Sequence, residues 1–124
     1  MLSKLEVHTT LPVQDLQRAK KFYADKLGLT PKSEVPAGLT YQCKDSWLLL
    51  FPSSGVSTGQ FTQAGWRTDN IEAEVAALKA KGVVFEEYNL PNFKTVNSIA
   101  TFGSNRSAWF KDSEGNLLGI VQMP

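Results

Sequence analysis

Hydrophobic and polar residues alternate near the start of the chain and then recur at helical spacing. Between Glu6 and Val13, apolar side chains alternate with polar ones, which predicts a strand with one buried face. Asp15 follows where a helix N-cap belongs, and Gly28 stands where a left-handed residue commonly ends a helix. The apolar stripe between them consists of Leu16, Ala19, Phe22, Tyr23 and Leu27. The pattern therefore predicts a strand followed by a helix.

The same pattern returns about 55 residues later, as in an internal repeat. Residues 63–68 again read as a strand, Asn70 takes the place of Asp15, and Gly82 closes a second helix. Ile71, Val75 and Leu78 form its apolar stripe. The repeat predicts two modules built on one plan.

Short strand-like segments follow each predicted helix. In the first half they are 39–43 and 47–51. In the second half they are 83–88, 99–102, 107–110 and 117–121. The residues between the last two, 112–116, are turn formers, since short polar side chains bond locally and Gly or Asn tolerates positive φ. Each half therefore predicts the order βαβββ.

Two βαβββ modules in tandem predict an α+β fold that forms a single domain over residues 1–124. Module one is expected at about 1–52 and module two at about 60–124, joined by a Ser/Gly-rich linker at about 53–59. A module of this size is marginal alone, so the two sheets should pair. We expect the helices on the outer faces and a cleft enclosed by the open faces of the sheets, where a ligand would bind.

The composition limits the function classes. The chain has 13 basic and 12 acidic side chains, a net charge of +1, so charge gives no reason to expect binding to nucleic acid or to an anionic membrane. Cys43 is the only cysteine, which excludes an internal disulfide and fits a reducing compartment. The start of the chain lacks a signal peptide pattern, and no segment has the roughly 20 apolar residues of a membrane span. We expect a cytoplasmic protein.

Motifs of other enzyme classes are missing. The sequence contains no P-loop, no Gly-x-Gly-x-x-Gly fingerprint and no Gly-x-Ser-x-Gly elbow. Cys43 would be nucleophilic only with His8 beside it, and its strand context indicates a buried thiol.

Several short motifs occur in one order over nearly the whole chain. They are the segments 8–16, 22–23, 27–29, 66–71 and 112–118. Together they resemble the vicinal oxygen chelate superfamily, which includes glyoxalase I, bleomycin-resistance proteins and extradiol dioxygenases. The resemblance implies the paired-module fold.

The resemblance also implies four metal-ligand positions, one on the first and one on the last strand of each module. In this sequence they are His8, about Leu50, Gln63 and Gly119. Leu and Gly offer no side-chain ligand, whereas a catalytic metal needs several imidazole, thiolate or carboxylate groups at about 2 Å. We therefore expect no metal and no cofactor, unless Glu6, or a Glu at 86 or 87, enters from an unexpected angle.

Two polar residues of the expected cleft have two interpretations each. His8, the only histidine, is either a plain polar cleft residue or a ligand contact that acts as acid or base near neutrality. Arg67 falls on the cleft side of its strand, where it would bind an anionic group. Alternatively, Arg67 reaches solvent or pairs with Asp69 or Glu72.

The aromatic residues are assigned by alternation. Trp109 should face the cleft or a subunit interface, where it either stacks on a flat ligand or packs in the core, while Phe110 faces the helices. Trp47 and Trp66 are expected in the core. Residues 88–98, with a Pro and three Asn, form either a loop in which Tyr88 and Phe93 close over a ligand or a strand extension with a bulge.

These expectations favour a metal-free small-molecule-binding protein comparable to the bleomycin-resistance branch, with a ligand that is apolar or aromatic, with or without an anionic group. The expected cleft residues are Leu48, Leu50, Trp109, Leu117 and Gly119, with His8, Gln63 and Arg67 as polar contacts. The alternative is a glyoxalase-like lyase or isomerase, with an atypical metal site or His8 as base. The resemblance further implies a homodimer, with the cleft either within one chain or between two.

Overall fold

A computed structural model describes all residues from 1 to 124. After a short 3-10 helix, Leu2–Lys4, the first module follows the predicted order. Its elements are β1 (Thr9–Val13), α1 (Leu16–Leu27), β2 (Ser33–Val35), β3 (Gly38–Cys43) and β4 (Ser46–Pro52). Neither helix of the protein is long and apolar enough to cross a membrane.

The second module repeats this order with one insertion. Its elements are β5 (Ala64–Arg67), α2 (Ile71–Ala80), β6 (Asn89–Leu90), β7 (Phe93–Val96), β8 (Ile99–Phe102), β9 (Asn105–Lys111) and β10 (Leu117–Gln122). Residues 88–98 thus form mainly the hairpin β6–β7, which extends the sheet as one of the two interpretations predicted. The strand expected at 83–88 is wrong: only Phe85 bridges to β9, because β8 already occupies the other part of that edge.

The predicted helix ends are confirmed. The Asp15 carboxylate accepts a hydrogen bond from the backbone N–H of Arg18 at 3.0 Å, and the Asn70 amide oxygen accepts one from Ala73 at 3.1 Å. Gly28 ends α1 at φ 69°, a backbone conformation that costs glycine little.

Each module builds one sheet, and the strand orders correspond. The first sheet runs β1-β4-β3-β2 and the second β5-β10-β9-β8-β7-β6. In both sheets the first and last strands of the module pair in parallel, and the remaining pairs are antiparallel. The hairpin β6–β7 is the only addition to the second sheet. The predicted α+β fold of two tandem βαβββ modules is therefore confirmed.

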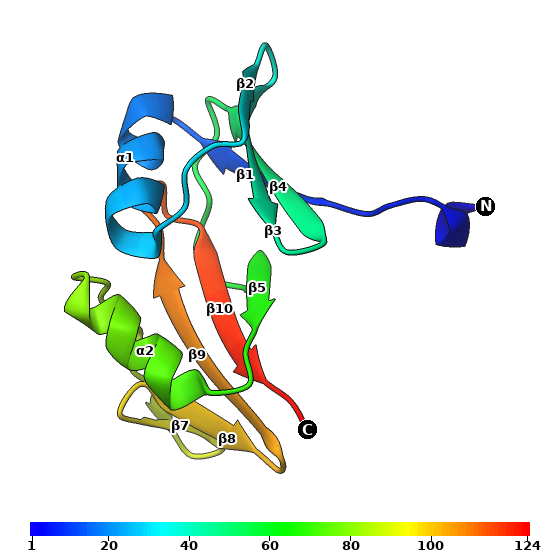
Figure 1. Ribbon diagram of the computed structural model, residues 1–124. Coiled ribbons are helices and arrows are strands. Elements are labelled where there is room, and N and C mark those ends of the chain that lie inside the picture. The colour runs from blue at the N-terminus through cyan, green and yellow to red at the C-terminus, as the bar shows by residue number, and fades with distance from the viewer.

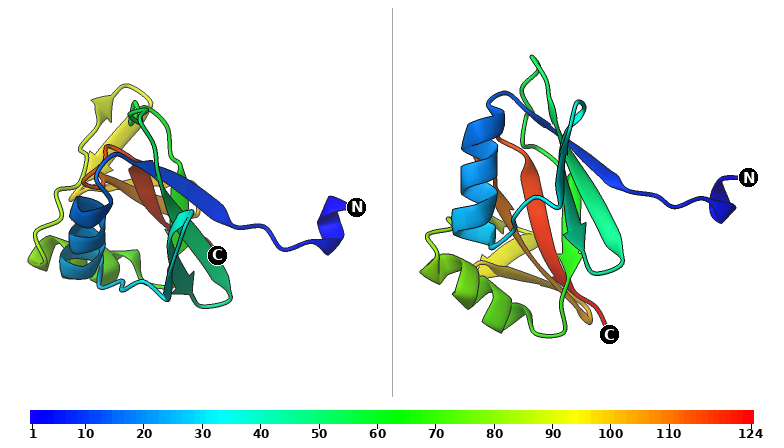
Figure 2. Two further views of the ribbon diagram at one scale, coloured as in Figure 1. Left: turned by 90° about the horizontal axis from the view of Figure 1, so that it is seen from above. Right: turned by 45° about the horizontal axis from the view of Figure 1, so that its top comes forward.

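The two modules share one hydrophobic core. Residues such as Leu11 and Leu50 from the first module and Phe110 and Ile120 from the second belong to one cluster of 17 buried residues. Helices α1 and α2 lie together on one side of the sheets (Figures 1 and 2). Each sheet therefore has a helix-covered face and an opposite face, which we call its open face.

One hollow lies between the two sheets, lined by Gln42 of the first and by Gly65 and Arg67 of the second. His8, Gln63 and Gly119 were expected to share a common cleft, but none of the larger hollows joins them. On the open faces, one hollow is lined by the first sheet beside Trp47 and another by the second sheet beside Trp109. The candidate site is therefore described one sheet at a time.

Candidate functional site

The open face of the second sheet is built around Gly119. In the strand register, Gly119 pairs with Gly65 on one side and with Trp109 on the other. A Cβ atom at Gly119 would lie 3.4 Å from both Trp109 Cδ1 and Thr62 Cγ2. The absence of a side chain at Gly119 thus lets the Trp109 indole lie close over β10. Trp109, Leu117 and Gly119 all lie on this open face, as alternation predicted.

Trp109 belongs to an aromatic cluster to which the inserted hairpin contributes. Its ring centroid lies 5.3 Å from that of Phe93 and 5.8 Å from that of Tyr88. The Tyr88 and Phe93 rings meet edge to face at 4.8 Å. The indole N–H of Trp109 donates to Thr62 Oγ1 at 3.0 Å, which fixes the plane of the ring. Such pairs favour offset and edge-to-face geometries, so the cluster is a rigid aromatic surface.

A hollow of about 280 Å³ lies beside this cluster. Its lining is Gln60, Phe61, Thr62, Tyr88, Leu90, Phe93, Trp109 and Leu117. Most of these side chains are apolar, and burial raises the pKa of the Tyr88 phenol, which therefore stays neutral. The hollow is close to the lower end of the volumes found for ligand pockets.

Gln63 has a structural role. Its side-chain oxygen accepts hydrogen bonds from the Leu117 N–H at 3.1 Å and from the Ser57 hydroxyl. Its amide N–H donates to Asn116 Oδ1 at 2.9 Å. Both ends of the amide therefore join the linker to the start of β10.

Leu48 and Leu50 lie in the core, and the prediction that they line the cleft is wrong. Both side chains are buried in the shared hydrophobic core, on the helix-covered face of β4. Trp47, Leu49 and Phe51 alternate with them and lie on the open face, only partly buried. The apolar run contains no alternation that would indicate its buried face, so the predicted cleft position at about Leu50 is wrong by one residue.

The strand pairing identifies the true counterpart of Gly119 in the first module. Gly119 pairs with Gly65, and Leu49 pairs with Thr10. Thr10 lies two residues after His8, and Gly65 lies two residues after Gln63, the first implied ligand position of each module. Leu49 is therefore the equivalent of Gly119, and it too lacks a metal-binding group.

His8 lies just before β1, against the open face of the first sheet, and does not line this hollow. Its imidazole stacks on Trp47, with ring centroids 3.7 Å apart and planes 11° from parallel. The Trp47 indole N–H donates to Glu6 Oε1 at 2.7 Å. The expectation that Trp47 lies in the core is wrong, because this pairing holds it on the open face. No carboxylate is hydrogen-bonded to the imidazole.

Arg67 reaches solvent at the end of β5. Its guanidinium donates to the Pro124 carbonyl at 3.4 Å, and it forms no ion pair with Asp69. Glu72 instead pairs with Arg106 at 2.7 Å. Arg67 lines a hollow between β5 and the β3–β4 hairpin, apart from the aromatic cluster. The neighbouring Trp66 packs against the core, as expected.

The metal-ligand positions implied by the fold do not fit a metal. The four residues are His8, stacked on Trp47, then Leu49, Gln63 and Gly119. Only one imidazole and one engaged amide stand at these positions, whereas Zn, Fe or Mn requires several imidazole, thiolate or carboxylate groups. No group of three or more His, Cys, Asp or Glu side chains in the chain is placed to hold a metal ion.

Sequence reasoning missed the long-range role of the β9–β10 turn. The Asp112 carboxylate accepts hydrogen bonds from the Tyr23 hydroxyl at 2.7 Å and from Asn116 Nδ2 at 2.9 Å. Asn116 also donates to the Pro12 carbonyl at 3.0 Å. These residues were predicted as turn formers. Nothing in their local spacing indicated hydrogen bonds to residues of β1 and α1.

Glu114 completes this connection. Its buried carboxylate pairs with Arg18 at 2.8 Å and accepts the backbone N–H groups of Gln14 and Asp15. The Arg18 guanidinium, with help from these N–H groups, holds the pKa of Glu114 at about 2. The turn therefore positions the aromatic face of the second sheet by attaching it to the first module.

Comparison with known proteins agrees with this architecture. The sequence model of the Glyoxalase/Bleomycin resistance protein/Dioxygenase superfamily matches residues 7–120. The chain belongs to this superfamily. The predicted resemblance to the vicinal oxygen chelate fold is thereby confirmed.

The chain is similar to one curated protein and to several solved structures. Uncharacterized protein YurT of Bacillus subtilis (strain 168) is 29% identical over 133 residues, covering 94% of this chain and 97% of YurT. TnmS3, an antibiotic binding protein from Streptomyces sp. CB03234, is 24% identical with a TM-score of 0.64, covering 97% and 98% of the two chains.

A third relative is a fosfomycin resistance protein. A mutant of FosX from Listeria monocytogenes, complexed with Mn(II) and a dihydroxypropylphosphonic acid, is 15% identical with a TM-score of 0.70. The match covers 97% of this chain and 92% of FosX. At such identities the structural likeness shows the fold alone, so the function has to be argued from the residues of this chain.

Proposed function

We propose that this superfamily member is a metal-free small-molecule-binding protein whose ligand lies against the aromatic cluster of the second sheet. The observation that carries the proposal is the pairing of Trp109 with Gly119. The resemblance implies a metal-binding side chain at position 119. This chain has Gly119 there, and the Trp109 indole lies against it. The position is thus used for apolar contact.

The chemistry of the hollow favours a flat apolar or aromatic ligand. Trp109, Phe93 and Tyr88 offer ring faces and edges, and aromatic pairs contribute about 0.5–1.5 kcal/mol beyond the area they bury. Lys111 lies on the same face opposite Leu117, with its ammonium group 3.6 Å from Glu86. This loose pair leaves Lys111 able to bind an anionic substituent of the ligand.

We also propose that the protein is a cytoplasmic homodimer. Met1, Leu2, Leu5 and Val7 are all at least 67% exposed, and they lie on a segment that extends away from the body (Figure 1). A second copy that covers these side chains and the open faces would remove apolar surface from water. Light scattering of the full chain at several concentrations tests the dimer, and a monomer at all of them would contradict it.

The enzymatic alternative has less support. A lyase or isomerase with His8 as base would need the imidazole beside the ligand and oriented by a partner. The imidazole stacks on Trp47 without a carboxylate hydrogen bond, and it lies on the other sheet from the aromatic hollow. We therefore favour binding without a reaction.

The proposal is tested by a thermal-shift screen of aromatic small molecules. The full chain should give compounds that raise Tm, and Trp109→Ala should lose those shifts because the stacking surface is gone. Trp47→Ala is the matched control, since it removes an indole from the other open face. Equal losses in both variants, or none in Trp109→Ala, would place the ligand elsewhere.

A further inference from the structure

The inserted hairpin β6–β7 makes the second sheet wider than the one helix that covers it. This sheet has six strands, the first sheet has four, and each is covered by one helix. Helix α2 packs on β10 and β9. A helix is about 10 Å wide and neighbouring strands lie about 4.8 Å apart, so one helix covers about two strands. Strands β8 and β7 therefore extend beyond α2.

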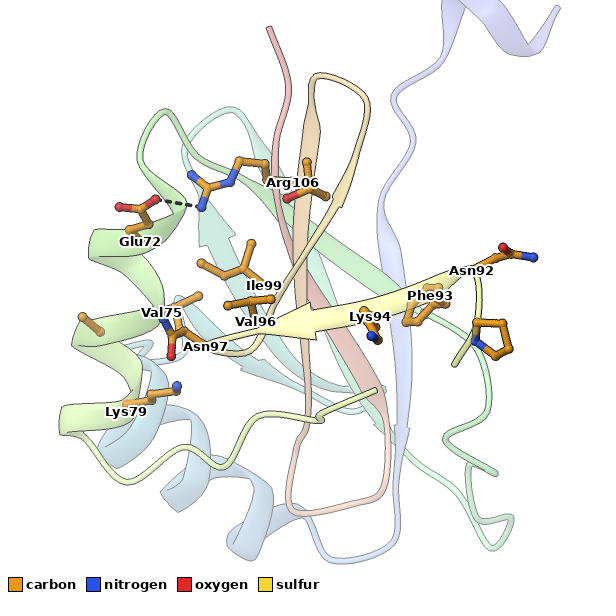
Figure 3. A pocket seen from close by; sticks show the side chains of 13 residues that line it. Glu72, Val75, Lys79, Asn92, Phe93, Lys94, Val96, Asn97, Ile99 and Arg106 are labelled. Atoms are coloured by element: carbon orange, nitrogen blue, oxygen red, sulfur yellow. Dashed lines mark ion pairs between the residues drawn. The ribbon is translucent and has the colours of Figure 1, made fainter. Parts of the chain in front are cut away.

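A groove of about 740 Å³ lies at this position, between α2 and the strands β7 and β8 (Figure 3). Its apolar side chains are Val75 and Ala76 from α2, Phe93 and Val96 from β7, and Ile99 from β8. Val75 and Ile99 are buried, whereas Val96 remains 71% exposed at the groove. The volume falls within the range of small-molecule sites, and Val96 has no covering partner in the chain.

Cationic side chains surround the apolar part of the groove. Lys79 lies on α2 at one end, and Lys94 lies on β7 (Figure 3). At the other end, Arg106 forms an ion pair with Glu72 at 2.7 Å. The groove thus carries three cations and one carboxylate, although the whole protein is close to neutral.

One further carboxylate lies near Lys79. The Lys79 ammonium helps to lower the pKa of Glu87, but the larger cause is hydrogen bonding from the hydroxyls of Ser98 and Thr95, at 2.7 and 2.8 Å. Glu87 is held by these hydroxyls and does not line the groove. Lys79 and Lys94 form no ion pair at salt-bridge distance.

We propose that this groove is a second binding site, for an organic anion with an apolar body such as a medium-chain carboxylate. The apolar body covers Val75, Val96 and Ile99, which removes exposed valine surface from water. The carboxylate is bound through charge-assisted hydrogen bonds by one of the two groove lysines without an ion pair, Lys79 on α2 or Lys94 on β7. Val96 and Ile99 lie on the opposite face of the sheet from Trp109, and Phe93, whose ring packs on Trp109, borders both hollows. The site goes beyond the proposed function.

Octanoate is the probe for this site, titrated into the isotope-labelled full chain and followed by amide chemical shifts. Shifts should saturate below about 10 mM and concentrate in residues 72–79 and 94–106. The uncharged 1-octanol should bind at least about fivefold more weakly, because it lacks the charge that the lysines recognise. Octanoate shifts centred on Trp109 and Leu117, or no saturable binding, would overturn the proposal.

Matched variants separate the groove from general charge effects. Lys79→Met with Lys94→Met should weaken octanoate binding at least about fivefold, whereas Lys4→Met with Lys81→Met removes the same charge outside the groove and should not. Val96→Asp, at an exposed position, should also abolish binding. Trp109→Ala should leave octanoate binding intact even if it abolishes the ligand of the proposed function. Equal affinities of the two double variants would overturn the site.

Discussion

The carboxylate of Glu114 binds the guanidinium of Arg18 through both oxygens. Glu114 Oε2 accepts from Arg18 Nε at 2.8 Å, and Oε1 accepts from Nη2 at 2.9 Å. The Glu114 side chain is fully buried, whereas that of Arg18 is half exposed. This ion pair attaches the β9–β10 turn of the second module to the first turn of α1, so it fixes the arrangement of the modules around their shared core.

Glu114→Gln should destabilise the protein by about 2 kcal/mol at pH 7, because it leaves a charged partner and two backbone N–H groups with weaker acceptors. Urea unfolding measures the difference. Glu34→Gln is the control, since Glu34 pairs with Lys20 at the surface and should cost less than about 0.5 kcal/mol. Equal costs for the two substitutions would contradict the role assigned to Glu114.

Acid should remove this contribution within a defined range. The pKa of Glu114 is lowered from 4.5 to about 2 in the folded protein, chiefly by hydrogen bonding from Arg18. Its stabilising effect is therefore complete above pH 4.5 and is lost as the pH falls towards 2. The free energy of unfolding of the wild type should fall more steeply over this range than that of Glu114→Gln. Parallel pH profiles would refute the assignment.

Tyr23 and Tyr41 form a matched pair of buried tyrosines. The Tyr23 hydroxyl donates to Asp112 at 2.7 Å, whereas the Tyr41 hydroxyl has no hydrogen-bond partner. Tyr23→Phe should therefore cost about 1.5–3 kcal/mol, and Tyr41→Phe should be neutral or slightly stabilising. Chemical denaturation of both variants decides this, and a larger loss from Tyr41→Phe would be the contrary result.

Gly119 and Gly38 should respond differently to alanine. A Cβ at Gly119 meets Thr62 and Trp109 at 3.4 Å, a distance that small shifts accommodate, so Gly119→Ala should change stability by less than about 1.5 kcal/mol. A Cβ at Gly38, where φ is 143°, would lie 1.9 Å from the Leu50 carbonyl oxygen. Gly38→Ala should cost more than about 3 kcal/mol. Thermal unfolding compares them; similar losses would show that the contacts at Gly119 are tighter than described.

The helix caps and the βαβββ order of the elements could be predicted because each depends on residues close together in the sequence. Asp15, Asn70 and Gly28 act within one helical turn of their positions. The face of β4 could not be predicted, since every side chain in the run around Leu49 and Leu50 is apolar and periodicity carries no information there.

The candidate site was predictable only in part. Trp109, Leu117 and Gly119 follow from alternation along two paired strands. The sequence pointed to Tyr88 and Phe93 only through the loop interpretation of residues 88–98. Their place beside Trp109 depends on how the inserted hairpin folds, and alternation along β9 and β10 gives no information on it. Contacts between modules depend on the tertiary arrangement, which local spacing does not encode.

The most direct test of the central claim is a calorimetric titration of the tightest aromatic compound from the screen into the full chain in excess chelator. The account predicts one compound bound per chain, with an affinity that the chelator does not change and that Trp109→Ala abolishes. Binding that disappears in chelator and returns on addition of Zn, Ni or Mn would contradict it, because the site would then depend on a metal.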